Sequence, residues 1–226
     1  MNFSKNQIAT AIAILFHSIG LIGILFFNSA FIINATSFNL LLSFALILYT
    51  QKQKNKYFYF FIFTTAIAGI FVEVIGVNTA LLFGEYVYGN VLGVKLNNVP
   101  LIIGINWIII IYCCGVSMQT VMLKVINSIA LQSGHPPRAV KALSVIIDGA
   151  TLAVFFDWIM EPVAIKLGYW QWNADEIPVY NYICWFIISA LLLTIFHFGN
   201  FNKKNKFAIH LLLIQLMFFL LLRTFL

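Results

Sequence analysis

Long apolar runs recur along the chain and are separated by short polar segments. Each run is about 20 residues long, which is the length an α-helix needs to cross a bilayer core of about 30 Å. The runs lack the alternation of apolar and polar positions that is typical of a transmembrane β-strand. We therefore predict an all-α, polytopic membrane helix bundle of about seven transmembrane helices, forming one domain over residues 1–226. The predicted spans are 8–27, 31–50, 57–83, 99–122, 139–160, 181–199 and 206–225.

Composition supports an integral multi-pass membrane protein. Hydrophobic residues make up 62% of the chain and charged residues 9%, whereas about a quarter of the residues of a soluble domain are charged. The net charge of +6 does not indicate nucleic-acid binding, because the basic residues lie in short groups between apolar runs. The three cysteines all lie in apolar runs, so we expect buried thiols and neither a disulfide framework nor a zinc site.

The basic residues predict the orientation of the chain. Four polar regions, separated by even numbers of crossings, hold ten of the thirteen basic residues. The positive-inside rule then puts the N-terminus in the cytoplasm and the C-terminus outside, and a bacterial-type plasma membrane is the expected location. The ten residues are Lys5, Lys52, Lys54, Lys56, Lys124, Arg138, Lys141, Lys203, Lys204 and Lys206.

Acidic residues gather in the outer half of the predicted bundle. Asp157 and Glu161 are four residues apart, so both project from one face of the fifth span. Pro162 is expected to end that helix. Counted from the inner ends, Glu73 on the third span and Asp157 differ in height by about 3 Å, so the two could face each other. Two solvated acids at a helix end are the alternative, but Glu73 lies deeper, and an ionisable residue inside a span is a candidate functional group.

Small residues surround Glu73 on its helix. Gly69, Glu73, Gly76 and Ala80 follow at spacings of four, three and four and form one stripe. Small residues allow close helix packing in membranes, so we expect this stripe, and Glu73 with it, to face the bundle interior.

All five tryptophans fall in the outer half, as Trp107, Trp158, Trp170, Trp172 and Trp185. Tryptophans form interfacial belts in membrane proteins, which is one interpretation. A belt normally has two sides, however, and no tryptophan lies in the inner half. The other interpretation is an aromatic wall beside the carboxylates, which would stabilise a developing carbocation by cation–π attraction.

Several kinds of site are not indicated. The four histidines are scattered, no glycine-rich dinucleotide motif follows a strand, and no aspartate-rich magnesium motif is present. We therefore predict no metal and no cofactor, and acid–base chemistry on an apolar substrate. His17 and Asp148 share a depth near mid-membrane and are expected to form a structural pair.

Two blocks of motifs resemble a known family, the carotenoid biosynthesis family that includes the CruF-type carotenoid 1,2-hydratases. The first block reads Glu73-x-x-Gly76-x-x-Thr79, Phe83-Gly84-x-Tyr86-x-Tyr88, Leu92-Gly93, Val99-Pro100 and Trp107. The second reads Asp157-x-x-x-Glu161-Pro162, Gly168-Tyr169-Trp170-x-Trp172, Pro178 and Asn181-x-x-x-Trp185. The chain departs from the family pattern at Ala80, where glycine is common, and at Glu161, where aspartate is usual.

The resemblance implies a cofactor-independent hydro-lyase. Such an enzyme adds water to the terminal C1=C2 double bond of an acyclic (ψ) end group of a carotene that is dissolved in membrane lipid. For this chemistry we assign Asp157 as the general acid, Glu161 as the base for water and Glu73 as an electrostatic stabiliser, and the sequence leaves open an exchange of these roles among the three carboxyl groups. Other carotenoid enzymes would be possible partners, and nucleic acid would not. The residues assigned to substrate binding are Thr79, Tyr86, Tyr88, Asn106, Trp107, Trp158, Trp170, Trp172, Asn181 and Trp185.

Two alternative functions remain open at this point. A cyclase or isomerase of the same end group would use the same protonation and the same cation, quenched by proton loss. A non-enzymatic carotenoid or lipid carrier, or a small transporter, is the other alternative. A proton-coupled transporter should carry acids along a path through the membrane, whereas these acids gather at one end.

Overall fold

The structure is a computed structural model that describes residues 3–27, 29–133, 138–173 and 176–226. Six helices in these ranges are long and apolar enough to cross a membrane, which confirms the predicted all-α membrane bundle. The helices are α1 (Lys5–Phe27), α2 (Ala30–Asn34), α3 (Thr36–Thr50), α4 (Lys56–Thr79), α5 (Ile102–Ser133), α6 (Arg138–Lys166), α7 (Val179–Phe198) and α8 (Lys206–Phe225). The strands are β1 (Tyr86–Tyr88), β2 (Lys95–Leu96), β3 (Val99–Pro100) and β4 (Trp170–Trp172).

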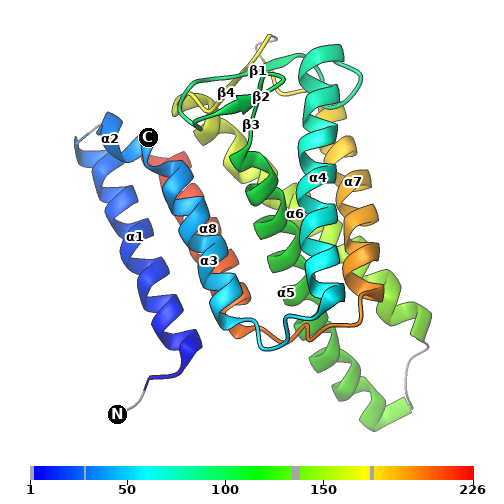
Figure 1. The fold of residues 1–226 in the computed structure, drawn as a ribbon. Coiled ribbons are helices and arrows are strands. Elements are labelled where there is room, and N and C mark those ends of the chain that lie inside the picture. The colour runs from blue at the N-terminus through cyan, green and yellow to red at the C-terminus, as the bar shows by residue number, and fades with distance from the viewer. Residues whose placement is uncertain (1–2, 28, 134–137, 174–175) are drawn as a thin grey trace.

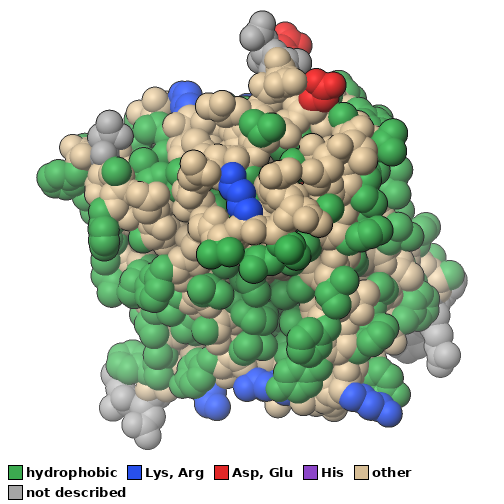
Figure 2. All heavy atoms as spheres, turned by 45° about the horizontal axis from the view of Figure 1, so that its top comes forward, with side chains coloured by type: hydrophobic (Ala, Val, Ile, Leu, Met, Phe, Trp, Pro, Cys, Tyr) green, Lys and Arg blue, Asp and Glu red, His purple; other side chains and the backbone are tan. Residues whose placement is uncertain are grey.

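Helix α5 is the centre of the bundle. It packs against α3, α4, α6, α7 and α8. Of the residues in its most apolar 18-residue stretch, 78% are buried, whereas the corresponding share is 28–39% in the other five long helices. In Figure 1, α1, α3 and α8 form one side of the bundle and α4, α6 and α7 the other, with the strands gathered at one end. Hydrophobic side chains cover the flanks of the molecule in Figure 2, as expected of helices that face lipid.

The second predicted span is divided in two. Helix α2 ends at Asn34, and α3 begins at Thr36. The Thr36 hydroxyl donates to the carbonyl of Ile33 at 2.7 Å and is hydrogen-bonded to the Tyr169 hydroxyl at 2.7 Å, so this side chain ties the break to the strand end of the bundle. The 15 residues of α3 extend about 22 Å, which is shorter than a bilayer core.

The prediction that Pro162 ends the fifth span was wrong, because α6 continues to Lys166. A proline inside a helix provides no N–H for the carbonyl four residues earlier, which here belongs to Trp158. The guanidinium of Arg223 on α8 donates to that carbonyl at 2.9 Å. The hydrogen bond that the proline removes is therefore replaced from a neighbouring helix, and Glu161 lies within a continuous helix.

The pairing of His17 with Asp148 was also predicted wrongly. His17 is buried and its Nδ1 is hydrogen-bonded to the Ala13 carbonyl at 2.8 Å. Asp148 is exposed on α6 and accepts a hydrogen bond from Ser144, one turn earlier. Each side chain is hydrogen-bonded within its own helix, so equal depth did not bring the two together.

Two small antiparallel pairs of strands cover one end of the bundle, and the sequence interpretation did not include them. Strand β1 pairs with β4, with Tyr86 opposite Trp172 and Tyr88 opposite Trp170, while β2 pairs with β3. Successive side chains of a strand point to opposite faces, so both tyrosines point inward and Val87 points outward. The β1–β4 pair therefore directs four aromatic side chains toward the helices below.

A Gly89→Ala variant should disturb this strand pair. The N–H of Gly89 donates to the Tyr169 carbonyl at 2.9 Å, and a Cβ at position 89 would lie 2.0 Å from the Gly168 carbonyl oxygen. We expect a loss of about 1–3 kcal/mol from this overpacking, measured by thermal unfolding in detergent. Val87→Ala, on the exposed side of β1, is the control and should unfold near the wild-type temperature; equal unfolding of both variants would contradict the prediction.

Candidate active site

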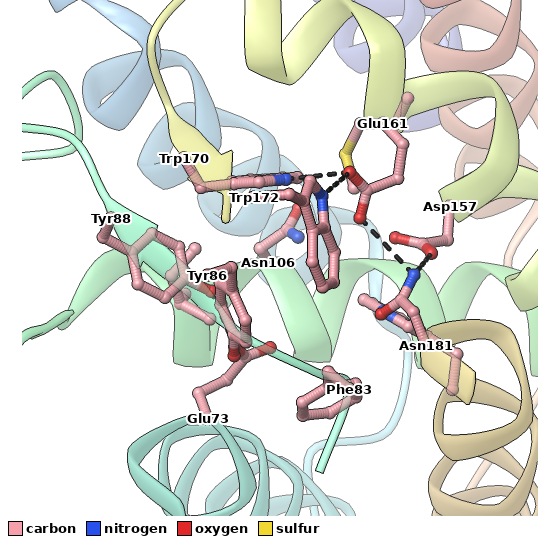
Figure 3. Close-up of a pocket in the computed structure, with 13 residues that line it drawn as sticks. Glu73, Phe83, Tyr86, Tyr88, Asn106, Asp157, Glu161, Trp170, Trp172 and Asn181 are labelled. Atoms are coloured by element: carbon pink, nitrogen blue, oxygen red, sulfur yellow. Dashed lines mark hydrogen bonds between the residues drawn. The ribbon is translucent and has the colours of Figure 1, made fainter. Parts of the chain in front are cut away.

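A small cavity lies between the helix ends and the strands, and it unites residues from both sequence blocks. Its volume is about 30 Å³, enough for one or two water molecules. The predicted site residues that line it are Glu73, Tyr86, Tyr88, Asn106, Asp157, Glu161, Trp170, Trp172, Asn181 and Trp185. Figure 3 shows these side chains converging from α4, α5, α6, α7 and the two strands. We call this cavity the acid pocket.

Glu73 is buried on α4 and surrounded by hydrogen-bond donors. Its Oε2 accepts hydrogen bonds from the hydroxyls of Tyr86 at 2.5 Å and Tyr88 at 2.7 Å. Its Oε1 accepts one from the indole N–H of Trp107 at 3.0 Å. An ionised carboxylate only accepts hydrogen bonds, so three converging donors match Glu73 as an anion.

The predicted small stripe on α4 faces the interior at its buried glycines. A Cβ at Gly69 would lie 2.6 Å from the ring of Trp107, and one at Gly76 would lie 2.9 Å from the hydroxyl of Tyr86. The absence of a side chain at both positions lets two of the donors reach Glu73. Ala80 is not part of the stripe, because it ends α4 in the left-handed conformation with φ of 55°.

Glu161 and Asp157 share one face of α6, as their spacing predicted. The Oε2 of Glu161 accepts hydrogen bonds from the indoles of Trp170 at 2.9 Å and Trp172 at 3.1 Å. The side-chain amide of Asn181 donates to Asp157 Oδ2 at 3.0 Å and approaches Glu161 Oε1 at 3.5 Å. Asn181 therefore bridges the two carboxyl groups from α7.

Asp157 differs from the two glutamates in its second oxygen. The side chain is 1% exposed, and its Oδ1 is buried without a hydrogen-bond partner in the part of the chain that the structure describes. In Figure 3 the carboxyl group of Asp157 points toward the pocket, beside Glu161. An oxygen without a donor is where a carboxylic acid can carry its proton, so the geometry leaves Asp157 free to present an O–H to a bound molecule.

The two tyrosines on β1 keep their protons. Burial, together with the negative charge of Glu73, raises the pKa of Tyr86 well above its ordinary value, and the same causes raise the pKa of Tyr88. Both phenols therefore remain hydrogen-bond donors to Glu73 across the pH range in which proteins are usually studied.

The charge of the pocket is one-sided. Among the described residues that line it there is no Lys, Arg or His, while three carboxyl groups do line it. Buried charges are costly unless they are paired or hydrogen-bonded, and here neutral O–H and N–H donors replace counter-ions. A cation that formed in this pocket would face three acidic groups and no basic side chain among the described lining residues.

The tryptophans contribute edges as well as faces. The sequence suggested a wall of ring faces, but Trp107, Trp170 and Trp172 turn their N–H groups to the carboxylates. Trp185 stacks on Trp107 with ring centroids 4.0 Å apart and planes at 10°. The aromatic set thus fixes the carboxylates and also lines the cavity.

Three predicted binding residues do not line the acid pocket. Trp107 donates to Glu73 from behind the lining, and the other two residues lie elsewhere. Trp158 is 48% exposed and lies under the guanidinium of Arg223, 4.1 Å from the ring centroid. It follows Asp157 directly, so it points about 100° away around the helix. Thr79 is exposed at the end of α4, and its hydroxyl donates to the Ile75 carbonyl at 2.6 Å. Neither residue lines the acid pocket.

Three apolar lining residues had not been assigned to the site from the sequence. They are Phe83, Ile103 and Met160. Met160 is three residues after Asp157 and so lies on the same helix face, which is a signal that spacing could have given. Phe83 has a φ of +66° and enters the pocket through a turn that hydrophobic patterning does not reveal.

Comparison with known proteins gives one match. A family model described as carotenoid biosynthesis protein matches residues 27–226. No curated protein and no solved structure matches the chain at a significant level. The matched range covers most of the 226 residues and includes every residue of the acid pocket. The chain therefore belongs to the carotenoid biosynthesis protein family.

Proposed function

We propose that this protein is a carotenoid 1,2-hydratase-like enzyme that adds water to the terminal C1=C2 double bond of an acyclic carotenoid end group. The family supports a role in carotenoid biosynthesis. One observation carries the finer proposal: three buried carboxyl groups meet in one pocket, and among the described residues only Asp157 has an oxygen without a donor. Such a set can donate a proton, stabilise a cation and accept a proton.

The first step in this proposal is protonation of the double bond. Asp157 transfers its proton to C2, the π bond supplies the electron pair for the new C–H bond, and a tertiary cation forms at C1. An isolated alkene is a weak base, so the cation requires electrostatic stabilisation. Glu73, held as an anion by three donors, supplies it together with the nearby aromatic rings.

The second step is capture of the cation by water. The water oxygen bonds to C1 while Glu161 accepts a proton from it, which gives the neutral tertiary alcohol. Asp157 has then lost one proton and Glu161 has gained one. Asn181 holds the two carboxyl groups beside each other, and transfer of the proton from Glu161 back to Asp157 restores the starting state. The net reaction is addition of one water molecule.

The membrane setting fits such a substrate. A carotene is dissolved in the hydrocarbon core, and the acid pocket is built by helices that are long and apolar enough to cross that core. We further propose that the N-terminus is cytoplasmic, with the pocket in the outer half of a plasma membrane, because the basic residues gather in the loops of the opposite side.

Expression in a lycopene-accumulating host is the direct test. We expect pigment whose mass has increased by one water per modified end, and incorporation of ¹⁸O when the cells grow in labelled water. An isomer of unchanged mass would instead indicate a cyclase or isomerase. Bound but unaltered pigment would indicate a carrier, and either result would contradict the hydratase.

A further inference from the structure

The acid pocket is too small for its proposed substrate, and a second cavity adjoins it. That second cavity has a volume of about 60 Å³ and shares Ile103, Asn106, Met160 and Trp170 with the acid pocket. We call it the junction cavity. Its remaining walls come from α1, α3, α6 and α8 and the segments before β4 and β2, so it leads from the acids toward the other side of the bundle.

A third and larger cavity lies next to the junction cavity, on the side away from the acid pocket. It has a volume of about 400 Å³ and lies between α1, the break at Ala35 and α3, with Phe218 from α8 at its inner end. It shares Thr36, Asn39 and Phe218 with the junction cavity. At its outer edge Phe31 is 80% exposed and Phe38 is 57% exposed, so it opens among apolar side chains that would face lipid. We call it the lipid-side cleft.

We propose that the lipid-side cleft and the junction cavity form the binding path for the polyene chain of the substrate, whose end group then reaches the acid pocket. This inference rests on the proposed function, because it takes the acid pocket as the site of reaction. The occupant is a long, narrow and almost wholly apolar chain that carries only methyl branches. The cleft matches it, because its walls are apolar apart from Thr36 and Asn39 near the inner end.

The side chain of Met160, which lies between the acid pocket and the junction cavity, can change its conformation. Met160 is buried and lines both cavities, and methionine has a flexible, unbranched side chain that adapts to its neighbours. An end group larger than the present cavities therefore needs displacement of side chains such as Met160, and not of the helices. The carboxyl groups keep their partners in this rearrangement, since none of their hydrogen bonds involves Met160.

A Gly20→Phe variant should block the path. Gly20 lines the lipid-side cleft, and a Cβ there would lie 3.3 Å from the ring of Phe218, at the inner end of the cleft. A phenyl group at this position would fill the cleft where it meets the junction cavity. Ala35→Phe is a second variant that should block the same space. Ala35 lines the same cleft but lies outside α1, so this substitution leaves the sequence of α1 unchanged.

Ser18→Phe is the matched control. Ser18 is also a small residue of α1, but it lines a separate groove of about 290 Å³ between α1 and α8. That groove also touches the junction cavity, through His17 and Phe218, so it is the competing route. We expect Ser18→Phe to behave like the wild type. Loss of binding in Ser18→Phe with retention in Gly20→Phe would overturn the assignment of the path.

The readout separates binding from reaction. Each variant is combined with Asp157→Asn, expressed with lycopene, purified in detergent, and measured for pigment retained per protein by absorbance. We expect Gly20→Phe and Ala35→Phe to retain about tenfold less pigment, equivalent to ~1.4 kcal/mol of binding free energy, while thermal unfolding in detergent stays close to that of Asp157→Asn alone. If Gly20→Phe and Ala35→Phe retain as much pigment as Asp157→Asn alone, the proposed path is overturned. It is also overturned if the two variants lose pigment only because they unfold at a lower temperature.

The same variants, made in protein that keeps Asp157, test turnover. If the wild type hydrates lycopene, Gly20→Phe and Ala35→Phe should reduce the yield of hydrated product. If the wild type retains pigment but adds no water, the proposed reaction fails while the binding comparison still decides the path.

Discussion

An Asp157→Asn variant should lose hydration activity by about 10²–10⁴-fold, the usual contribution of a general acid. Asparagine has nearly the shape of aspartate but carries no transferable proton. Its side-chain oxygen can still accept the 3.0 Å hydrogen bond from Asn181. Its amide N–H group then lies where Asp157 Oδ1 now has no partner among the described residues, beside Glu161. We therefore expect normal folding and loss of the chemical step alone.

The control for this variant lies on the same helix. Asp148→Asn makes the same chemical change at an exposed position whose only described side-chain partner is Ser144, one turn earlier. It should leave the yield of hydrated pigment unchanged. Product yields are compared by mass in the lycopene host, with protein amount and thermal unfolding measured in parallel. Full hydration by Asp157→Asn would remove Asp157 from the role of acid.

Most helices could be predicted because a bilayer imposes a long apolar segment on each crossing. The last two spans, predicted at 181–199 and 206–225, correspond closely to α7 and α8. The errors arose where partners distant in sequence decide the outcome. Arg223 replaces the hydrogen bond that Pro162 removes, and the hydroxyl of Tyr169 binds Thr36 at the break before α3. Hydrophobic patterning contains neither contact.

The carboxyl groups of the site could be found from the sequence for a related reason. Helical spacing put Asp157 and Glu161 on one face, and counting from the inner ends put Glu73 within about 3 Å of the height of Asp157. All three line one pocket. The directions of the indole and phenol groups could not be found, because they depend on the pairing of β1 with β4. That pairing joins segments more than 80 residues apart, and each strand has only three residues.

The different surroundings of the three carboxyl groups explain why similar residues can have different proposed roles. Glu73 and Glu161 each accept indole N–H groups, and Glu73 accepts two phenols as well. Fixed donors around a carboxylate are already oriented before the reaction, so they need not reorganise when a cation forms. Asp157 receives one amide donor, and its other oxygen has no partner in the described part of the chain. The division between stabiliser and acid follows from how many donors each group receives.

A Glu73→Gln variant should reduce turnover by about 10²-fold, within the range measured when one preorganised electrostatic partner is removed. Glutamine fits the same space and can satisfy the same neighbours. The Trp107 indole only donates, so the glutamine oxygen should face it. The phenols of Tyr86 and Tyr88 can accept as well as donate, so the glutamine N–H₂ group should face them. The negative charge is then lost while each of the three neighbours keeps a hydrogen-bond partner.

The contrast with Glu73→Leu makes this prediction specific for charge. Leucine would leave the three buried donors without their acceptor, at about 1–3 kcal/mol for each unsatisfied group, so we expect lower unfolding temperature as well as lost activity. Glu73→Gln should unfold near the wild-type temperature, retain pigment as Asp157→Asn does, and yet form little hydrated product. Because the raised pKa values of Tyr86 and Tyr88 keep both phenols protonated, raising the pH to 9 should not restore the missing charge or the activity. If Glu73→Gln instead hydrates lycopene at the wild-type rate, Glu73 stabilises the fold of the pocket and not the cation.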